Sequence, residues 1–151
     1  MKIKSAAFKN YERIPMECTC DGDGNSPQLE FLDVPENAKS LVLIVDDPNA
    51  PGGTFIHWLI WNIAQNTTEI KKNSVPEGAI VGKNSSDTND YVGPCPPDSQ
   101  HVYLFKLYAL DTLLPFDANL TKKEIRAQME GHILEKDTLH GFYERVGGEN
   151  F

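Results

Sequence analysis

The chain has 151 residues, of which 22 are acidic and 14 are basic, and its formal net charge is −8. This length suits one domain, residues 1–151, that is large enough to bury a hydrophobic core. The acidic excess argues against a nucleic-acid-binding protein, because such binding depends on dense clusters of lysine and arginine. The acidic excess is compatible with a small anionic ligand that is bound by a few local hydrogen-bond donors.

Two features of the sequence indicate that the protein lies in a reducing compartment of the cell. The N-terminal residues contain no apolar stretch of signal-peptide length, and no later stretch is long enough to span a membrane, so we expect a cytoplasmic protein. The odd number of cysteines then argues against disulfide bonds, and we predict that Cys18, Cys20 and Cys95 are reduced. The three thiols could together bind a metal ion, but small buried side chains without a metal are the favoured interpretation.

The first predicted elements are short. A strand is possible over Ile14–Cys20, and a loop rich in glycine and polar turn residues follows over Asp21–Pro27. A brief strand is expected over Leu29–Phe31, before the chain reaches its most apolar stretch.

The chain is organised around the five apolar residues Leu41–Val45, which are too few for a helix and predict a strand buried on both faces. Asp46 and Asp47 follow, and then Pro48 and Pro51, which cannot continue a sheet ladder. We therefore expect the carboxylate of Asp47 to be held at a strand end by a stiff turn.

Two further strands are predicted to lie near the first one. His57 precedes a strand-like stretch, Trp58–Ile63, and a short strand is plausible over Ala79–Val81 within a long polar loop. A proline-rich bend over Gly93–Pro97 then leads into His101–Leu110, which is almost continuously apolar. We expect Leu41–Val45 and residues 103–109 of this later strand to be central in one sheet and fully buried.

One helix is predicted near the C-terminus. Thr121 and Glu124 have the spacing of a capping box. Apolar residues then recur at every fourth position, as in an amphipathic helix: Ile125, Met129 and Ile133. The helix should last to about Lys136, and a final strand is suggested over His140–Val146. Five or six strands with one or two late helices make a mainly β domain.

Three proline-stiffened bends at strand ends carry the candidate chemistry. They read D-P-N-A-P from Asp47, G-x-x-x-H-W ending at Trp58, and G-P-C-P-P from Gly93 followed by H-x-Y at His101. In combination they resemble the signature of the phosphatidylethanolamine-binding protein family, and most closely its bacterial and archaeal, Raf-kinase-inhibitor-like branch. The resemblance covers nearly the whole chain and includes further short matches: Arg13–Pro15, Cys20–Gly22, Ser26–Pro27, Ser40–Leu41, Tyr108–Asp111, Gly131–Ile133 and Gly141–Arg145.

The resemblance implies a large antiparallel sheet packed on a smaller sheet, with helices near the C-terminus and a small surface pocket for phosphate-like anions. Carried over by motif, the ligand-binding residues are Asp47, His57, Gly93, Cys95, Pro96, His101 and Tyr103. The chain departs from the usual pattern at Asn49, where the family has a second acid, and at Val102, where it has an arginine. Both departures remove a charge beside the predicted pocket.

The chemistry of the predicted pocket residues suits an anion. The imidazoles of His57 and His101, the hydroxyl of Tyr103 and the backbone amides near Gly93 can all donate hydrogen bonds. Asp47 would repel an anion, so we consider two roles for it. It could fix the tautomer and charge of a histidine, which we favour, or it could bind the ammonium group of a zwitterion such as phosphoethanolamine.

The leading functional hypothesis is a small binding protein for phosphate-type or phosphoethanolamine-like ligands, without cofactor, metal or catalytic residues. The resemblance further implies modulation of a kinase or protease and a possible homodimer. One alternative is a hydrolytic or phosphoryl-transfer enzyme that uses Asp47 and His57 as an acid–base pair, or Cys95 as a thiol paired with a histidine. A second alternative is a protease-inhibitor scaffold with a vestigial pocket.

Overall fold

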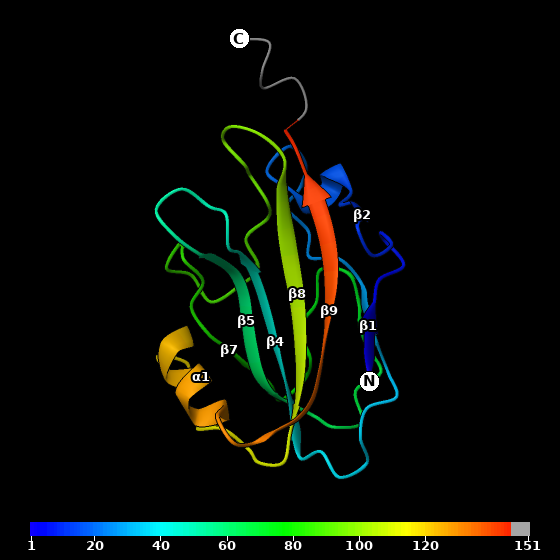
Figure 1. Cartoon of the computed structure of the whole chain (residues 1–151), viewed down its shortest axis with the longest axis vertical. Coiled ribbons are helices and arrows are strands. Elements are labelled where there is room, and N and C mark those ends of the chain that lie inside the picture. The colour runs from blue at the N-terminus through cyan, green and yellow to red at the C-terminus, as the bar shows by residue number, and fades with distance from the viewer. Residues whose placement is uncertain (146–151) are drawn as a thin grey trace.

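The computed structural model describes residues 1–145, which form two packed β-sheets and one α-helix (Figure 1). In this part of the chain the larger sheet has the order β2 (Glu12–Arg13), β9 (Ile133–Tyr143), β8 (His101–Leu110), β4 (Ser40–Asp47), β5 (Phe55–Ile63) and β7 (Ile80–Val81). The smaller sheet has the order β1 (Lys2–Lys4), β3 (Leu29–Leu32) and β6 (Glu69–Ile70). All neighbouring strands are antiparallel except β2 and β9. The predicted mainly β architecture is confirmed.

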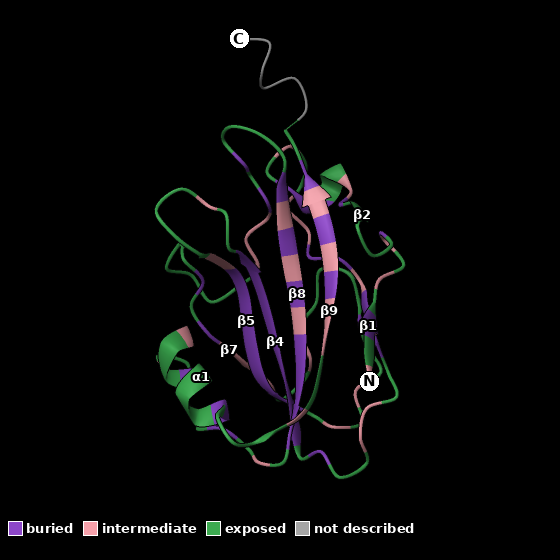
Figure 2. Ribbon diagram, viewed as in Figure 1, coloured by how far each residue is buried: buried purple, intermediate pink, exposed green. Residues whose placement is uncertain are grey.

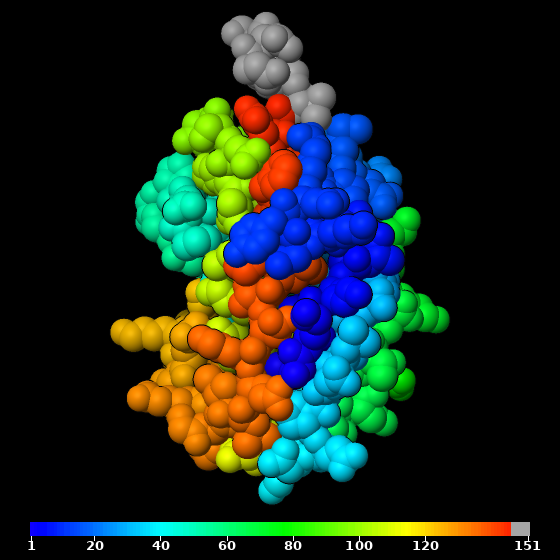
Figure 3. Space-filling model, turned by 45° about the vertical axis from the view of Figure 1, so that its right-hand side comes forward, coloured from blue at the N-terminus to red at the C-terminus, as the bar shows by residue number. Residues whose placement is uncertain are grey.

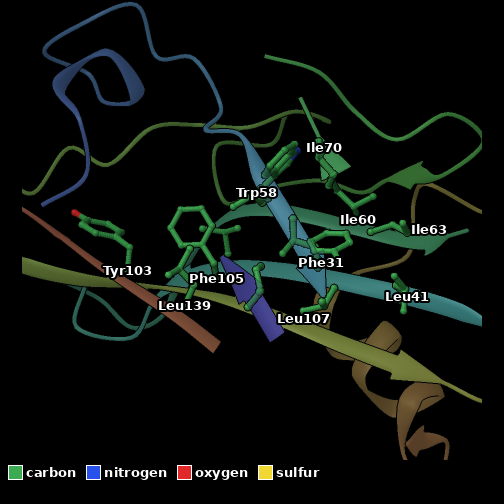
Figure 4. Packing of buried hydrophobic residues seen from close by; sticks show 14 of the residues in the cluster. Phe31, Leu41, Trp58, Ile60, Ile63, Ile70, Tyr103, Phe105, Leu107 and Leu139 are labelled. Atoms are coloured by element: carbon green, nitrogen blue, oxygen red, sulfur yellow. The ribbon is translucent and has the colours of Figure 1, made fainter. Parts of the chain in front are cut away.

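Strand β4 lies in the middle of the larger sheet and is buried along its whole length (Figure 2). Its alternate residues enter two different hydrophobic clusters, because successive side chains of a strand point to opposite faces. Leu41, Leu43 and Val45 belong to the same hydrophobic cluster as Phe31 of the smaller sheet. Figure 4 shows Leu41 and Phe31 within this cluster. The other face is covered by helix α1 (Lys122–Met129) and the segment before it. The predicted double-sided burial of this strand is confirmed.

Strand β8 has the predicted bounds and a central position, but the expectation that residues 103–109 are fully buried is wrong at two places. Leu104 and Lys106 are only half-buried. They lie on the same face as Tyr108 and Leu110, and the apolar cluster that contains the buried residues of α1 includes those two later residues but neither Leu104 nor Lys106. The helix is too short to cover the whole strand.

Helix α1 begins as predicted and ends early. The side chain of Thr121 accepts a hydrogen bond from the backbone of Glu124, whose carboxylate accepts one from the backbone of Thr121. The helix ends at Met129 and not near Lys136, because Gly131 adopts a positive φ of 81°, a common helix stop. Beyond it the chain becomes β9, which pairs with β8 and contains the predicted final strand as far as Tyr143; Val146 lies outside the described residues.

The strand expected over Ile14–Cys20 is not formed. The two-residue strand β2 ends directly before this segment, and a 3-10 turn, η1 (Met16–Cys18), lies within it. The N-terminal segment instead lies across β9 (Figure 3), where the N–H of Tyr11 donates to His140 and the N–H of Ile14 donates to Phe142. This contact joins the two ends of the described chain.

The prediction that all three cysteines are reduced is wrong. Cys20 and Cys95 form a disulfide bond, with Cα atoms 5.4 Å apart, and Cys18 is a buried free thiol. Burial raises the pKa of the Cys18 thiol to about 11. The count of cysteines could not reveal this pair, because residues 75 positions apart are brought together only by the tertiary fold. Cys20 and Cys95 are therefore not available as metal ligands.

None of the helices in the described residues is long and apolar enough to cross a membrane. The cytoplasmic location stays a prediction.

Candidate functional site

A cavity of about 270 Å³ opens at one end of the strands of the larger sheet, where β4 ends and β5 and β8 begin. The three strands are antiparallel neighbours, so these ends meet at the same end of the sheet, below the loops that contain residues 48–54 and 91–100 (Figure 1). All seven predicted residues line this cavity: Asp47, His57, Gly93, Cys95, Pro96, His101 and Tyr103. The structure thus brings the predicted set together; that the set binds a ligand stays a prediction.

A β-bulge positions His57. Val45 pairs with Trp58 and Asp46 pairs with Ile56, so His57 is an extra residue in β5 without a partner of its own in β4. The bulge interrupts the regular alternation of β5, and the ring of His57 lies edge-on to Tyr103, with centroids 5.2 Å apart. Bulges frequently redirect a side chain beside a functional site. Nothing in the sequence signalled this one.

His57 is held as a neutral imidazole. Its Nδ1 donates to the backbone oxygen of Val92 at 2.7 Å, because a carbonyl oxygen can only accept. Burial lowers the pKa of His57, and this effect outweighs the hydrogen bond to Val92 and the nearby charge of Asp47, which both raise it. At neutral pH the proton therefore sits on Nδ1, and Nε2 is a hydrogen-bond acceptor.

His101 is held in the opposite charge state. Its Nδ1 bonds to Oδ2 of Asp47 at 2.5 Å and its Nε2 bonds to Oδ1 of Asp98 at 2.9 Å. Burial by itself lowers the pKa of His101, but the two carboxylates outweigh burial and the net shift is upward. An imidazole that donates from both nitrogens is an imidazolium, so the cavity wall contains one fixed cation.

Asp47 is the central carboxylate at this end of the sheet. It is buried, and its Oδ1 also accepts the backbone N–H of Asn49 at 2.9 Å. The favoured role of Asp47, fixing the charge of a histidine, agrees with this geometry, and the histidine is His101. Asp46 points to the opposite face, where Lys106 and Lys122 both donate to it at 2.9 Å.

Tyr103 adds a hydroxyl group that stays protonated. Burial, followed by the charge of Asp47, raises the pKa of Tyr103 well above its usual value. The hydroxyl can therefore donate a hydrogen bond throughout the physiological pH range. The adjacent Val102 lies on the other face of β8, so the loss of the family's arginine there leaves the cavity side of the strand unchanged.

The wall formed by Gly93 to Pro97 is fastened to the N-terminal segment. A Cβ atom at Gly93 would lie 2.6 Å from the backbone oxygen of Cys18, so only glycine fits there. The N–H of Cys20 donates to the backbone oxygen of Pro94, and the Cys20–Cys95 disulfide adds a covalent link. Cys95 therefore lines the cavity as a disulfide, and the hypothesis that it acts as a thiol nucleophile is wrong for this structure.

Sequence reasoning missed several residues of the site. The remaining lining residues are Ala50, Pro51, Phe55, Ser86, Val92 and Pro97. Three of them, Ala50, Pro51 and Pro97, belong to the motifs already singled out, and these could have been found. Asp98 carried no signal, because an acid after a proline-rich bend is an ordinary turn residue.

Comparison with known proteins matches residues 4–144 to the sequence model of a family described as phosphatidylethanolamine-binding protein. A UPF0098 protein of Methanothermobacter thermautotrophicus is 44% identical over 150 residues, covering 96% of this chain and 99% of the relative. A UPF0098 protein of Chlamydia pneumoniae is 43% identical with the same coverage of both chains.

Solved structures have the same fold. The crystal structure of a phosphatidylethanolamine-binding protein homologue from Chlamydia trachomatis has a TM-score of 0.92 and 39% identity, over 96% of this chain and 97% of that one. That of YbcL from E. coli has a TM-score of 0.89 and 28% identity, over 96% and 98% of the two chains.

Proposed function

Because the chain belongs to the phosphatidylethanolamine-binding protein family, we propose that it is a binding protein for a phosphate-type anion, which it holds in the cavity at the Asp47 end of the larger sheet. The observation that carries the proposal is His101, a buried imidazolium in the cavity wall. The imidazolium is balanced by the carboxylates of Asp47 and Asp98, so it favours an anionic ligand as a charge-assisted N–H donor and not through a net positive charge of the site.

The other donors and acceptors favour a phosphoryl group over a simple halide. Tyr103 supplies a hydroxyl donor, and His57 presents Nε2 as an acceptor while it is neutral. A phosphate monoanion carries both oxygens that accept and a P–OH group that donates, so it can satisfy all three side chains. As the pH falls through the pKa of His57, this ring becomes a second cationic donor.

The test is calorimetric titration of the protein with inorganic phosphate and with phosphoethanolamine. His101→Gln should weaken phosphate binding by about tenfold or more, because a hydrogen bond to a charged group is lost. His132→Gln is the matched control, since His132 also bonds an aspartate, Asp111, but is exposed and does not line the cavity. Tyr103→Phe provides a second, milder variant. No phosphate binding by the unmodified protein, or equal effects of the two histidine variants, would contradict the proposal.

The enzyme hypothesis required an acid–base pair of Asp47 and His57. The carboxylate of Asp47 bonds instead to His101, and the ring of His57 bonds to a backbone oxygen. A screen for turnover of phosphomonoesters, with His57→Ala as the control, tests this hypothesis directly. Modulation of a kinase or protease, the inhibitor scaffold and the homodimer stay predictions from the family resemblance.

A further inference from the structure

Both ring nitrogens of His101 are occupied by carboxylates of the chain itself. The side chain of Asp47 is 4% exposed, whereas that of Asp98 is 64% exposed. Asp47 is thus a fixed part of the site. Asp98 is a surface group that can leave His101 at little cost, because its carboxylate returns to water and exposed ion pairs are weak.

We propose that Asp98 is an internal competitor for the ligand of this cavity. Its carboxylate takes the hydrogen-bonding position on Nε2 of His101 that a bound anion needs, and the anion binds by displacing it. This inference rests on the proposed function. The geometry supports it because Nδ1 is committed to the buried Asp47, which leaves Nε2 as the one nitrogen of His101 that an incoming anion can reach.

The competitor makes the site selective among anions. Asp98 lies three residues before His101, so its carboxylate is tethered at an effective concentration on the order of millimolar or above. A free monocarboxylate offers the same chemical group without the tether and gains nothing by the exchange. A phosphate monoanion carries the same charge as a monocarboxylate, but its P–OH group can also donate to Nε2 of neutral His57 and its further oxygens can accept from Tyr103. The site therefore favours phosphoryl groups over carboxylates.

Among the described residues, the charged and titratable groups that contact His101 or line the cavity with it are Asp98, Asp47, His57 and Tyr103. Substitution of Asp98 removes one of the two carboxylates that keep His101 protonated, so the variant must be compared at about pH 6, below the ordinary pKa of histidine. Asp47 remains in place and continues to favour the imidazolium. In the Asp98→Asn protein the site therefore still contains the imidazolium of His101 but no longer contains the competing carboxylate.

The experiment compares the unmodified protein with Asp98→Asn and Asp87→Asn at physiological ionic strength, titrated with inorganic phosphate and with acetate. Asp87 is the control, since it is an exposed carboxylate next to the lining residue Ser86 but pairs with Lys83. Asp98→Asn should lower the dissociation constant for phosphate by about two- to fivefold, the range of an exposed ion pair. Acetate should gain at least as much, and Asp87→Asn should change neither ligand by a comparable factor.

Nitrogen NMR of the imidazole provides a second measurement. In the unmodified protein, phosphate should move the Nε2 resonance of His101 more than that of Nδ1. Unchanged or weaker phosphate binding by Asp98→Asn, with good binding by the unmodified protein, overturns the inference and leaves the proposed function standing. Equal gains in both Asn variants also overturn it, because they indicate a general effect of charge. No phosphate binding by either the unmodified protein or Asp98→Asn overturns both proposals.

Discussion

At the scale of single residues, the two histidines of the cavity differ in charge because their hydrogen-bond partners differ. His57 bonds to a neutral carbonyl oxygen and is dominated by burial, which lowers its pKa. His101 bonds to two carboxylates, which raise its pKa in spite of burial. At neutral pH, therefore, His101 has an N–H group on both nitrogens and His57 has one on Nδ1 alone. That either ring donates to a ligand stays a prediction.

Asp47→Asn should lower the pKa of His101 and weaken phosphate binding by about 1–3 kcal/mol, the range for a sheltered, charge-assisted hydrogen bond. The pKa of His101 is raised in the folded protein, so the contribution of its cation is complete below the ordinary value near ~6.5 and is lost as the pH rises through the raised value. The variant should lose affinity at a lower pH than the unmodified protein does.

Calorimetry on either side of neutrality, with NMR titration of His101, measures both effects. Asp111→Asn is the control, because its exposed pair with His132 does not line the cavity. Tighter phosphate binding by Asp47→Asn would show that the carboxylate only repels the ligand.

At the scale of elements, strands could be predicted where a nearly continuous apolar pattern is present, as in β4, which is buried on both faces, and in β8, which is fully buried only in its later half. The end of α1 could not, because Ile133 continues the four-residue spacing of the helix although it belongs to β9 and is 42% exposed. The pairing of β9 along β8 overrides that local pattern. Likewise, the motifs identified the lining of the cavity, but neither the bulge at His57 nor the contact of Asp98 has a local signature.

The wall element from Gly93 to Pro97 depends on close packing at its first residue. Gly93→Ala should destabilise the protein by about 1–3 kcal/mol, the usual cost of overpacking, because the new Cβ would meet the backbone of Cys18. It should also weaken phosphate binding by displacing the wall. Urea denaturation and calorimetry measure the two effects. Gly52→Ala is the control, because a Cβ at Gly52 meets no other atom and the substitution therefore tests backbone strain alone. A Gly93→Ala protein as stable as the unmodified protein would refute the close packing at Gly93.

At the scale of the whole molecule, the two sheets pack together through the hydrophobic layer between them, and the N-terminal segment adds β2 to the larger sheet beside β9. The Cys20–Cys95 disulfide adds a covalent connection between two loops, and restriction of the unfolded chain by a crosslink of this span stabilises a protein by about 4 kcal/mol. This connection was the largest error of the sequence prediction. A cysteine count and an inferred compartment cannot replace knowledge of which loops pack together.

The same bond closes residues 20–95 into a covalent ring that contains β3 to β7. Asp47 lies inside the ring and His101 lies beyond it. A protease that cuts the exposed turn around Val75 therefore places Asp47 and His101 on different fragments, which the disulfide still links. On a denaturing gel the nicked protein should run as one band without reductant and as two shorter fragments with it. Nicked protein should still bind phosphate, and fragments that separate without reductant would show that the ring is open.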